Sequence, residues 1–158
     1  MRISLLAPLA LVVLGPSLPA PVGACSQSDI DGGTHSLDPA FSADTTPPSP
    51  VTVTYEILPH SPADSGCGGT KCGRLPLVLL RLSASDVGTP SERVGYKFTV
   101  VDGQPPQGLH VSSVLLAANG EVGLPFDTDA GSFSFDLEVR AVDLNGNEGP
   151  PVVIAIED

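Results

Sequence analysis

The chain has 158 residues, 18 of them acidic and 7 basic, which gives a formal net charge of −11 at pH 7. An acidic field of this kind repels phosphate backbones, so we expect no nucleic acid as a partner. Any contact with a membrane is then expected to come from a lipid rather than from a basic surface.

The first predicted element is a signal peptide, residues 1–24. Arg2 is the only charge ahead of an apolar run from Ile3 to Leu14. This run has the length of a signal-peptide core and is too short to span a bilayer. We therefore expect the protein to be exported, and no later stretch is long and apolar enough to act as a second anchor.

The residues "PVGAC", Pro21 to Cys25, resemble the lipobox of bacterial lipoproteins. The resemblance implies that Cys25 is lipidated and becomes the mature N-terminus. Cleavage by an ordinary signal peptidase after Ala24 is the alternative. Ser26 is not the aspartate that retains many lipoproteins at the inner membrane, so the resemblance implies an outer-membrane location, on the periplasmic or the surface face.

Residues 25–50 are rich in Ser, Thr, Pro and Asp and end in "DTTPPSP". Few apolar groups are present to offset the entropy of ordering, which predicts a flexible tether. His35 lies alone in this segment and is interpreted as a bystander.

Two further cysteines, Cys67 and Cys72, occur in "GCGGTKCG". With Cys25 lipidated they form one pair, and the glycines allow a tight ring, so we expect a disulfide. A zinc half-site is the competing interpretation, but a tetrahedral site needs about four ligands and no second cysteine or histidine pair is available.

Residues 51–158 have the size of one domain and show apolar residues at every second position. The clearest alternating stretches are Val51 to Leu58, Val94 to Val100 and Phe133 to Ala141, with further candidates at Leu77 to Ala84, Val111 to Ala117 and Val152 to Ile156. Stretches rich in Gly, Pro, Asn and Asp connect them. The pattern predicts an all-β domain, a single sandwich of about seven strands.

The stretches "VGYKFTV" and "FSFDLEVRAVDLNGNEG" followed by "PPVVIAIED" resemble strands of fibronectin type III and related immunoglobulin-like sandwiches. Two departures indicate a divergent member. The chain has no tryptophan, so Leu80 or Leu82 must fill the space of the tryptophan typical of the second strand. Phe135 stands where a corner tyrosine is typical.

Asp143, Asn145 and Asn147 alternate in a way that is similar to the calcium linkers of cadherins. Gly146, however, replaces the central aspartate of that motif, and the following proline is displaced. Asn145-Gly146 is also a strong hairpin dipeptide, because both residues tolerate positive φ. We interpret the stretch as a turn.

Asp127 and Asp129 form a second acidic pair in "PFDTDAG". They could share a calcium ion, or act as acid and base if burial or a charged partner separated their pKa values. A solvated turn is the favoured interpretation. No metal site is therefore expected, and the calcium candidates are Asp127, Asp129, Asp143, Asn145 and Asn147.

The chain contains no G-x-S-x-G, no H-E-x-x-H and no phosphate-binding glycine loop, so we expect no enzymatic activity and no cofactor. The expected function is that of a non-enzymatic, envelope-anchored binding or adhesion module that holds a protein or a glycan. The alternative is a structural or accessory subunit of an envelope complex, stabilised by calcium.

Overall fold

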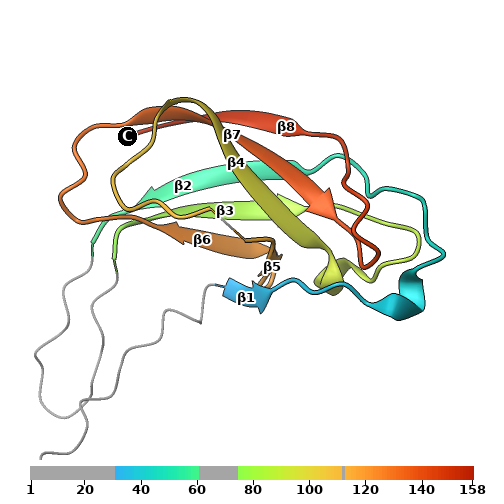
Figure 1. Ribbon diagram of the computed structural model, residues 1–158. Coiled ribbons are helices and arrows are strands. Elements are labelled where there is room, and N and C mark those ends of the chain that lie inside the picture. Colours follow the sequence, from blue (N-terminus) through green and yellow to red (C-terminus); the bar gives the residue numbers. More distant parts are fainter. Residues whose placement is uncertain (1–30, 61–74, 112) are drawn as a thin grey trace, which may run out of the picture.

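The computed structural model describes residues 31–60, 75–111 and 113–158 (Figure 1). Their strands are β1 (Asp31–Thr34), β2 (Thr52–Leu58), β3 (Leu77–Ser83), β4 (Gly95–Gln104), β5 (Leu115–Ala117), β6 (Glu121–Pro125), β7 (Ser134–Val142) and β8 (Val152–Glu157). Two short 3-10 helices, η1 (Pro39–Phe41) and η2 (Ser91–Arg93), lie in the connections. The strands form one antiparallel sheet in the order β1-β5-β4-β7-β8 and a second in the order β2-β3-β6. The predicted all-β sandwich is therefore confirmed.

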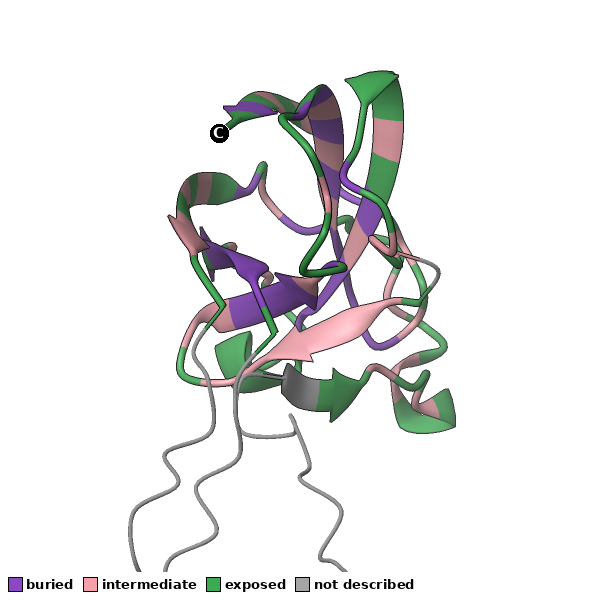
Figure 2. Cartoon of the chain, turned by 90° about the vertical axis from the view of Figure 1, so that its left-hand side faces the viewer, coloured by how far each residue is buried: buried purple, intermediate pink, exposed green. Residues whose placement is uncertain are grey.

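The core lies between the two sheets, and β7 shows why these residues form it. Phe135, Leu137, Val139 and Ala141 face inward and are buried, while the residues between them are only partly covered. Figure 2 shows this alternation of buried and more exposed residues along the strands. From the other sheet both Leu80 and Leu82 enter the core, so two leucines supply apolar volume in a sandwich without tryptophan.

Three elements differ from the sequence prediction. The strand expected from Val111 is shorter and begins at Leu115, and neither β1 nor β6 was predicted. A tight turn at Asn119-Gly120, with φ of 54° and 81°, joins β5 to β6, and Ala118 and Glu121 exchange backbone hydrogen bonds across it. These are the positive φ values that a two-residue primed turn requires.

Residues 31–50 do not extend away from the domain as the tether prediction required. The β1 strand pairs with β5, Asp38 N donates to Leu144 O at 2.8 Å, and Ser49 N donates to Ser85 O at 2.8 Å. Backbone pairing and local side-chain hydrogen bonds hold this segment, and such contacts leave no apolar pattern in the sequence. The folded unit therefore includes residues 31–50 and is not limited to residues 51–158.

Cys25, Cys67 and Cys72 lie outside the described residues, so the lipid anchor and the disulfide remain predictions. Among the described residues no helix has the length and apolar character needed to cross a membrane.

Candidate functional site

The turn between β7 and β8 lies at the right-hand end of the sandwich in Figure 1. Gly146 N donates to Asp143 O at 3.2 Å and Asp143 N donates to Asn147 O at 3.1 Å, so the predicted turn is confirmed. Gly146 has a positive φ of 91°, as expected. Among the described residues Asn119 is the only non-glycine residue with positive φ, so Asn145 does not have one. The prediction that Asn145 also takes positive φ is therefore wrong.

Asp143 is fully buried in this turn, with 0% of its surface exposed. Its Oδ1 accepts hydrogen bonds from the backbone N–H groups of Asn145 (2.9 Å) and Asn147 (2.8 Å). Its Oδ2 accepts one from the side-chain amide of Asn147 at 2.7 Å. The carboxylate thus organises the turn from inside.

Two more carboxylates meet Asp143 from distant parts of the chain. Asp44 lies in the segment before β2 and Asp86 in the loop between β3 and η2. One ligand oxygen from each of the three residues lies within 4.8 Å of the others. The side-chain amides of Asn145 and Asn147 donate to the backbone carbonyl of Asp44, at 2.6 and 2.9 Å, and bring it to the turn.

Asp44 and Asp86 each have one carboxylate oxygen that accepts hydrogen bonds from backbone N–H groups of the same loop. Asp44 Oδ1 accepts from Thr46 N at 2.9 Å, and Asp86 Oδ2 accepts from the N–H groups of Gly88 (3.0 Å) and Thr89 (2.7 Å). The other oxygens, Asp44 Oδ2 and Asp86 Oδ1, are buried, and no donor in the described part of the chain forms a hydrogen bond with them. Asp44, Asp86 and Asp143 together form the carboxylate cluster.

His35, which the sequence analysis interpreted as a bystander, lies near this cluster. It is partly buried, beside Gly95 and Val114. Burial lowers its pKa below the ordinary value of 6.5, and the nearby negative charge of Asp143 opposes this effect. Its Nε2 is buried and has no hydrogen-bond partner in residues 31–60, 75–111 and 113–158.

The structure does not bring Asp127 and Asp129 to Asp143. Both are exposed in the loop that precedes β7, whereas Asp143 follows β7, at the other end of a nine-residue strand. Among the described residues only Asp44, Asp86 and Asp143 form a group that could hold a metal ion. Sequence reasoning missed Asp44 and Asp86, and the only local signal was the Asp-x-Gly-Thr turn at Asp86.

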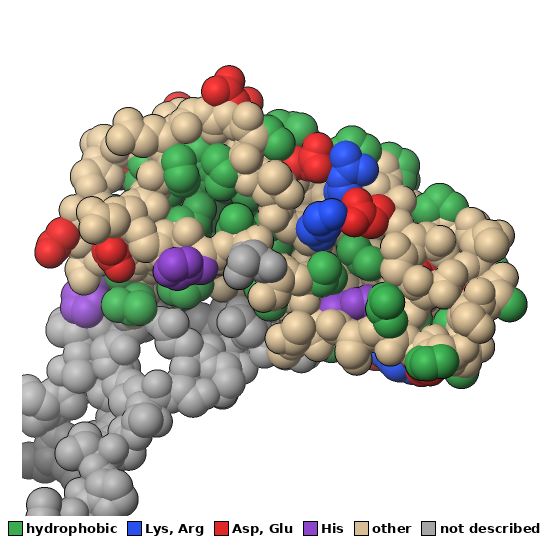
Figure 3. Space-filling view, viewed as in Figure 1, with side chains coloured by type: hydrophobic (Ala, Val, Ile, Leu, Met, Phe, Trp, Pro, Cys, Tyr) green, Lys and Arg blue, Asp and Glu red, His purple; other side chains and the backbone are tan. Residues whose placement is uncertain are grey.

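A groove runs along the edge of β4, and it is called the β4 groove below. It has a volume of about 480 Å³ and is lined by residues 97–100 of β4 and by Val111, Ser113 and Val114. Figure 3 shows hydrophobic side chains at the base of a hollow on the face of the molecule that carries β4. The β5 strand pairs with β4 only at Gly95 and Tyr96.

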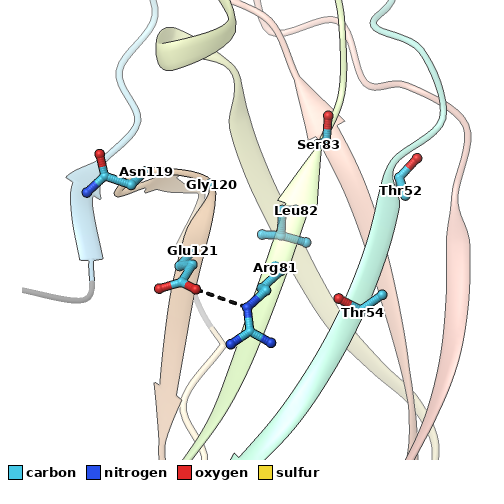
Figure 4. Close-up of a pocket in the computed structure, with 8 residues that line it drawn as sticks. All are labelled: Thr52, Thr54, Arg81, Leu82, Ser83, Asn119, Gly120 and Glu121. Carbon is cyan, nitrogen blue, oxygen red and sulfur yellow. Dashed lines mark hydrogen bonds and ion pairs between the residues drawn. The ribbon is translucent and has the colours of Figure 1, made fainter.

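A second groove, of about 350 Å³, lies on the other sheet (Figure 4). Its lining includes Thr52 and Thr54 of β2, Arg81 of β3, and Glu121 of β6. Arg81 pairs with Glu56 and with Glu121, each at 3.1 Å. This groove therefore offers mainly hydroxyl groups and an already neutralised cation to a ligand.

Comparisons of the chain with protein-family models, curated proteins and solved structures gave no match.

Proposed function

We propose that this protein is an exported, non-enzymatic binding module that is held at the cell envelope, on the outer membrane, by a lipid on Cys25. The order of the strands supports the immunoglobulin-like resemblance: β2, β3 and β6 occupy the places of strands A, B and E, and β4, β7 and β8 those of C, F and G. Sandwiches of this kind bind partners through loops or free strand edges.

The observation that carries the proposal is the unpaired edge of β4. On one side β4 pairs with β7 from Gly95 to Gln104. On the other side, beyond Tyr96, no strand of the described residues pairs with it. Such an edge presents backbone N–H and C=O groups to a partner strand.

An extended segment of another envelope protein fits this edge better than a glycan does. An added strand would form backbone hydrogen bonds with β4, and its alternate side chains would face the groove. The floor there includes Phe98, Val100 and Val111, so the segment should carry apolar residues at every second position.

Placing a charge in the β4 groove is expected to remove the partner. Val100→Lys should reduce recovery of the main partner at least tenfold after whole-cell cross-linking and purification of the full-length chain, because the charge would meet the partner's apolar side chains. Val53→Lys is the matched control, since Val53 of β2 is also a partly buried valine packed against the core. Equal recovery with both variants, or retention on a glycan that Val100→Lys does not change, would contradict this proposal.

A structural subunit of an envelope complex is the second candidate. The carboxylate cluster favours this candidate if the role of the cluster is to stabilise the fold. Partner stoichiometry separates the two candidates. A partner that stays bound at a fixed ratio through purification indicates a subunit, whereas a partner recovered only after cross-linking indicates a binding module.

Substitution of Cys25 tests the anchor. Cys25→Ser should leave the protein unprocessed or release it into the aqueous phase, whereas the wild type should partition into detergent, because the acyl chains supply the membrane affinity. Detergent-phase partitioning measures both. A water-soluble wild type with an unmodified mature N-terminus would refute lipidation.

A further inference from the structure

The carboxylate cluster joins three separate segments of the chain. Asp44 belongs to residues 31–50, Asp86 to the loop after β3, and Asp143 to the turn after β7. Among the described residues, none of these three carboxylates has a lysine, arginine or histidine within ion-pair distance. Three like charges at this separation repel one another unless a cation lies between them.

The unpartnered oxygens provide an independent indication of a ligand. Asp44 and Asp86 are partly buried residues, but their atoms Asp44 Oδ2 and Asp86 Oδ1 are almost completely inaccessible to solvent, and no described residue donates a hydrogen bond to them. A Cβ atom on Gly88 would collide with Asp44 Oδ2, so this oxygen lies against the Asp86 loop. Buried carboxylate oxygens normally have a donor or a metal as partner.

The donor atoms indicate which cation would bind. All three ligands are carboxylates, and a site without nitrogen or sulfur ligands suits hard cations better than zinc or copper. Magnesium requires near-ideal octahedral geometry and retains several waters, whereas calcium accepts irregular sets of about six to eight oxygens. A crowded site with buried oxygens from three loops therefore favours calcium.

We propose that Asp44, Asp86 and Asp143 form a calcium site that fastens the N-terminal segment, residues 31–50, to the end of the sandwich. The ion replaces the repulsion between the three carboxylates with attraction. The contacts that remain without it include the β1–β5 pairing, the Arg93–Asp38 ion pair at 3.1 Å, the Arg93 guanidinium over the Phe41 ring and several hydrogen bonds. Removing calcium consequently releases this segment first, β1 included, while the other strands of the two sheets stay folded.

Calcium titration of the full-length chain after treatment with a chelator tests the site. Calcium at 100 times its dissociation constant should raise Tm by roughly 10 °C, because the ion binds only the folded state. Magnesium at the same concentration should raise Tm less. Asp86→Asn should abolish the calcium response, and Asp129→Asn, which makes the same change at an exposed position, should leave it intact.

The chelated proteins provide a second comparison. Without calcium, Asp86→Asn should be at least as stable as the wild type, because one of three repelling charges is gone. With calcium, the order should reverse. A variant that is simply misfolded would be less stable in both conditions, and that result would overturn the assignment of Asp86.

Hydrogen exchange tests the fastening of the segment separately. Removing calcium should speed exchange in residues 31–46 at least tenfold and leave β3, β4 and β7 unchanged. Absence of any calcium response in the wild type, or an unchanged response in Asp86→Asn, would overturn the site. Equal responses to magnesium would overturn the choice of calcium, and calcium binding with unchanged exchange in residues 31–46 would overturn the fastening.

Discussion

Asp143→Ala is expected to lower the free energy of unfolding by about 3 kcal/mol, even in the presence of a chelator. The substitution leaves three N–H donors without their acceptor, the backbone groups of Asn145 and Asn147 and the side-chain amide of Asn147. Each hydrogen bond to a charged group contributes about 1.5–3 kcal/mol, and relief of repulsion from the other two carboxylates offsets part of the loss. Chemical denaturation measures the change.

Two other substitutions delimit this effect. Asp143→Asn keeps an oxygen for the two backbone donors and should lose less stability than Asp143→Ala. Asp129→Ala, at an exposed position, should change the free energy of unfolding by less than about 0.5 kcal/mol. A loss below about 1 kcal/mol for Asp143→Ala would mean that water replaces the carboxylate, and the turn would not depend on it.

Phe135→Ala is expected to lower the free energy of unfolding by about 3–5 kcal/mol, because it removes a large buried side chain and the surrounding core relaxes only partially into the cavity. Phe135 is 2% exposed. Its ring lies 6.0 Å from that of Phe133, which in turn meets Phe126 edge to face at 5.3 Å. The substitution should therefore also weaken a contact between aromatic rings, and the denaturation midpoint should fall accordingly.

Val153→Ala provides the comparison for Phe135→Ala. Val153 lies on β8, next to β7, and is 52% exposed, so its truncation should change stability by about 0.5 kcal/mol or less. Similar losses for the two variants would show that the core is loosely packed around Phe135.

The longer strands were predictable because a half-buried strand carries its burial pattern in its own sequence. The alternation along β7 identified the inward residues correctly. In contrast, β6 contains Gly123 and Pro125 within five residues, and β1 has the sequence "DGGT". Both strands depend on pairing with distant partners, β3 and β5, and a local pattern cannot report such pairing.

The candidate sites were predictable only in part. Asp143 was recognisable because it precedes an Asn-Gly dipeptide in a turn between two clear strands. Asp44 and Asp86 were not, since each lies in a loop whose own sequence reads as an ordinary polar connection. The topology of the sandwich brings these loops to one end, and among the described strands it also leaves one edge of β4 unpaired beyond Tyr96.

If the β4 groove binds a partner as proposed, the docking of residues 31–50 limits the distance from the membrane anchor at which it can do so. If Cys25 carries the proposed lipid, only residues 25–30 separate the anchor from β1, a length that spans at most about 20 Å. If residues 31–50 detached from the domain, the linker would comprise residues 25–50, and its maximum span would be about 90 Å. The effective concentration of a tethered group falls with roughly the −3/2 power of linker length. For partners in the same membrane, the effective concentration of the β4 groove would therefore drop about tenfold. The longer linker would therefore lower the effective concentration near the anchor and allow contact with more distant partners.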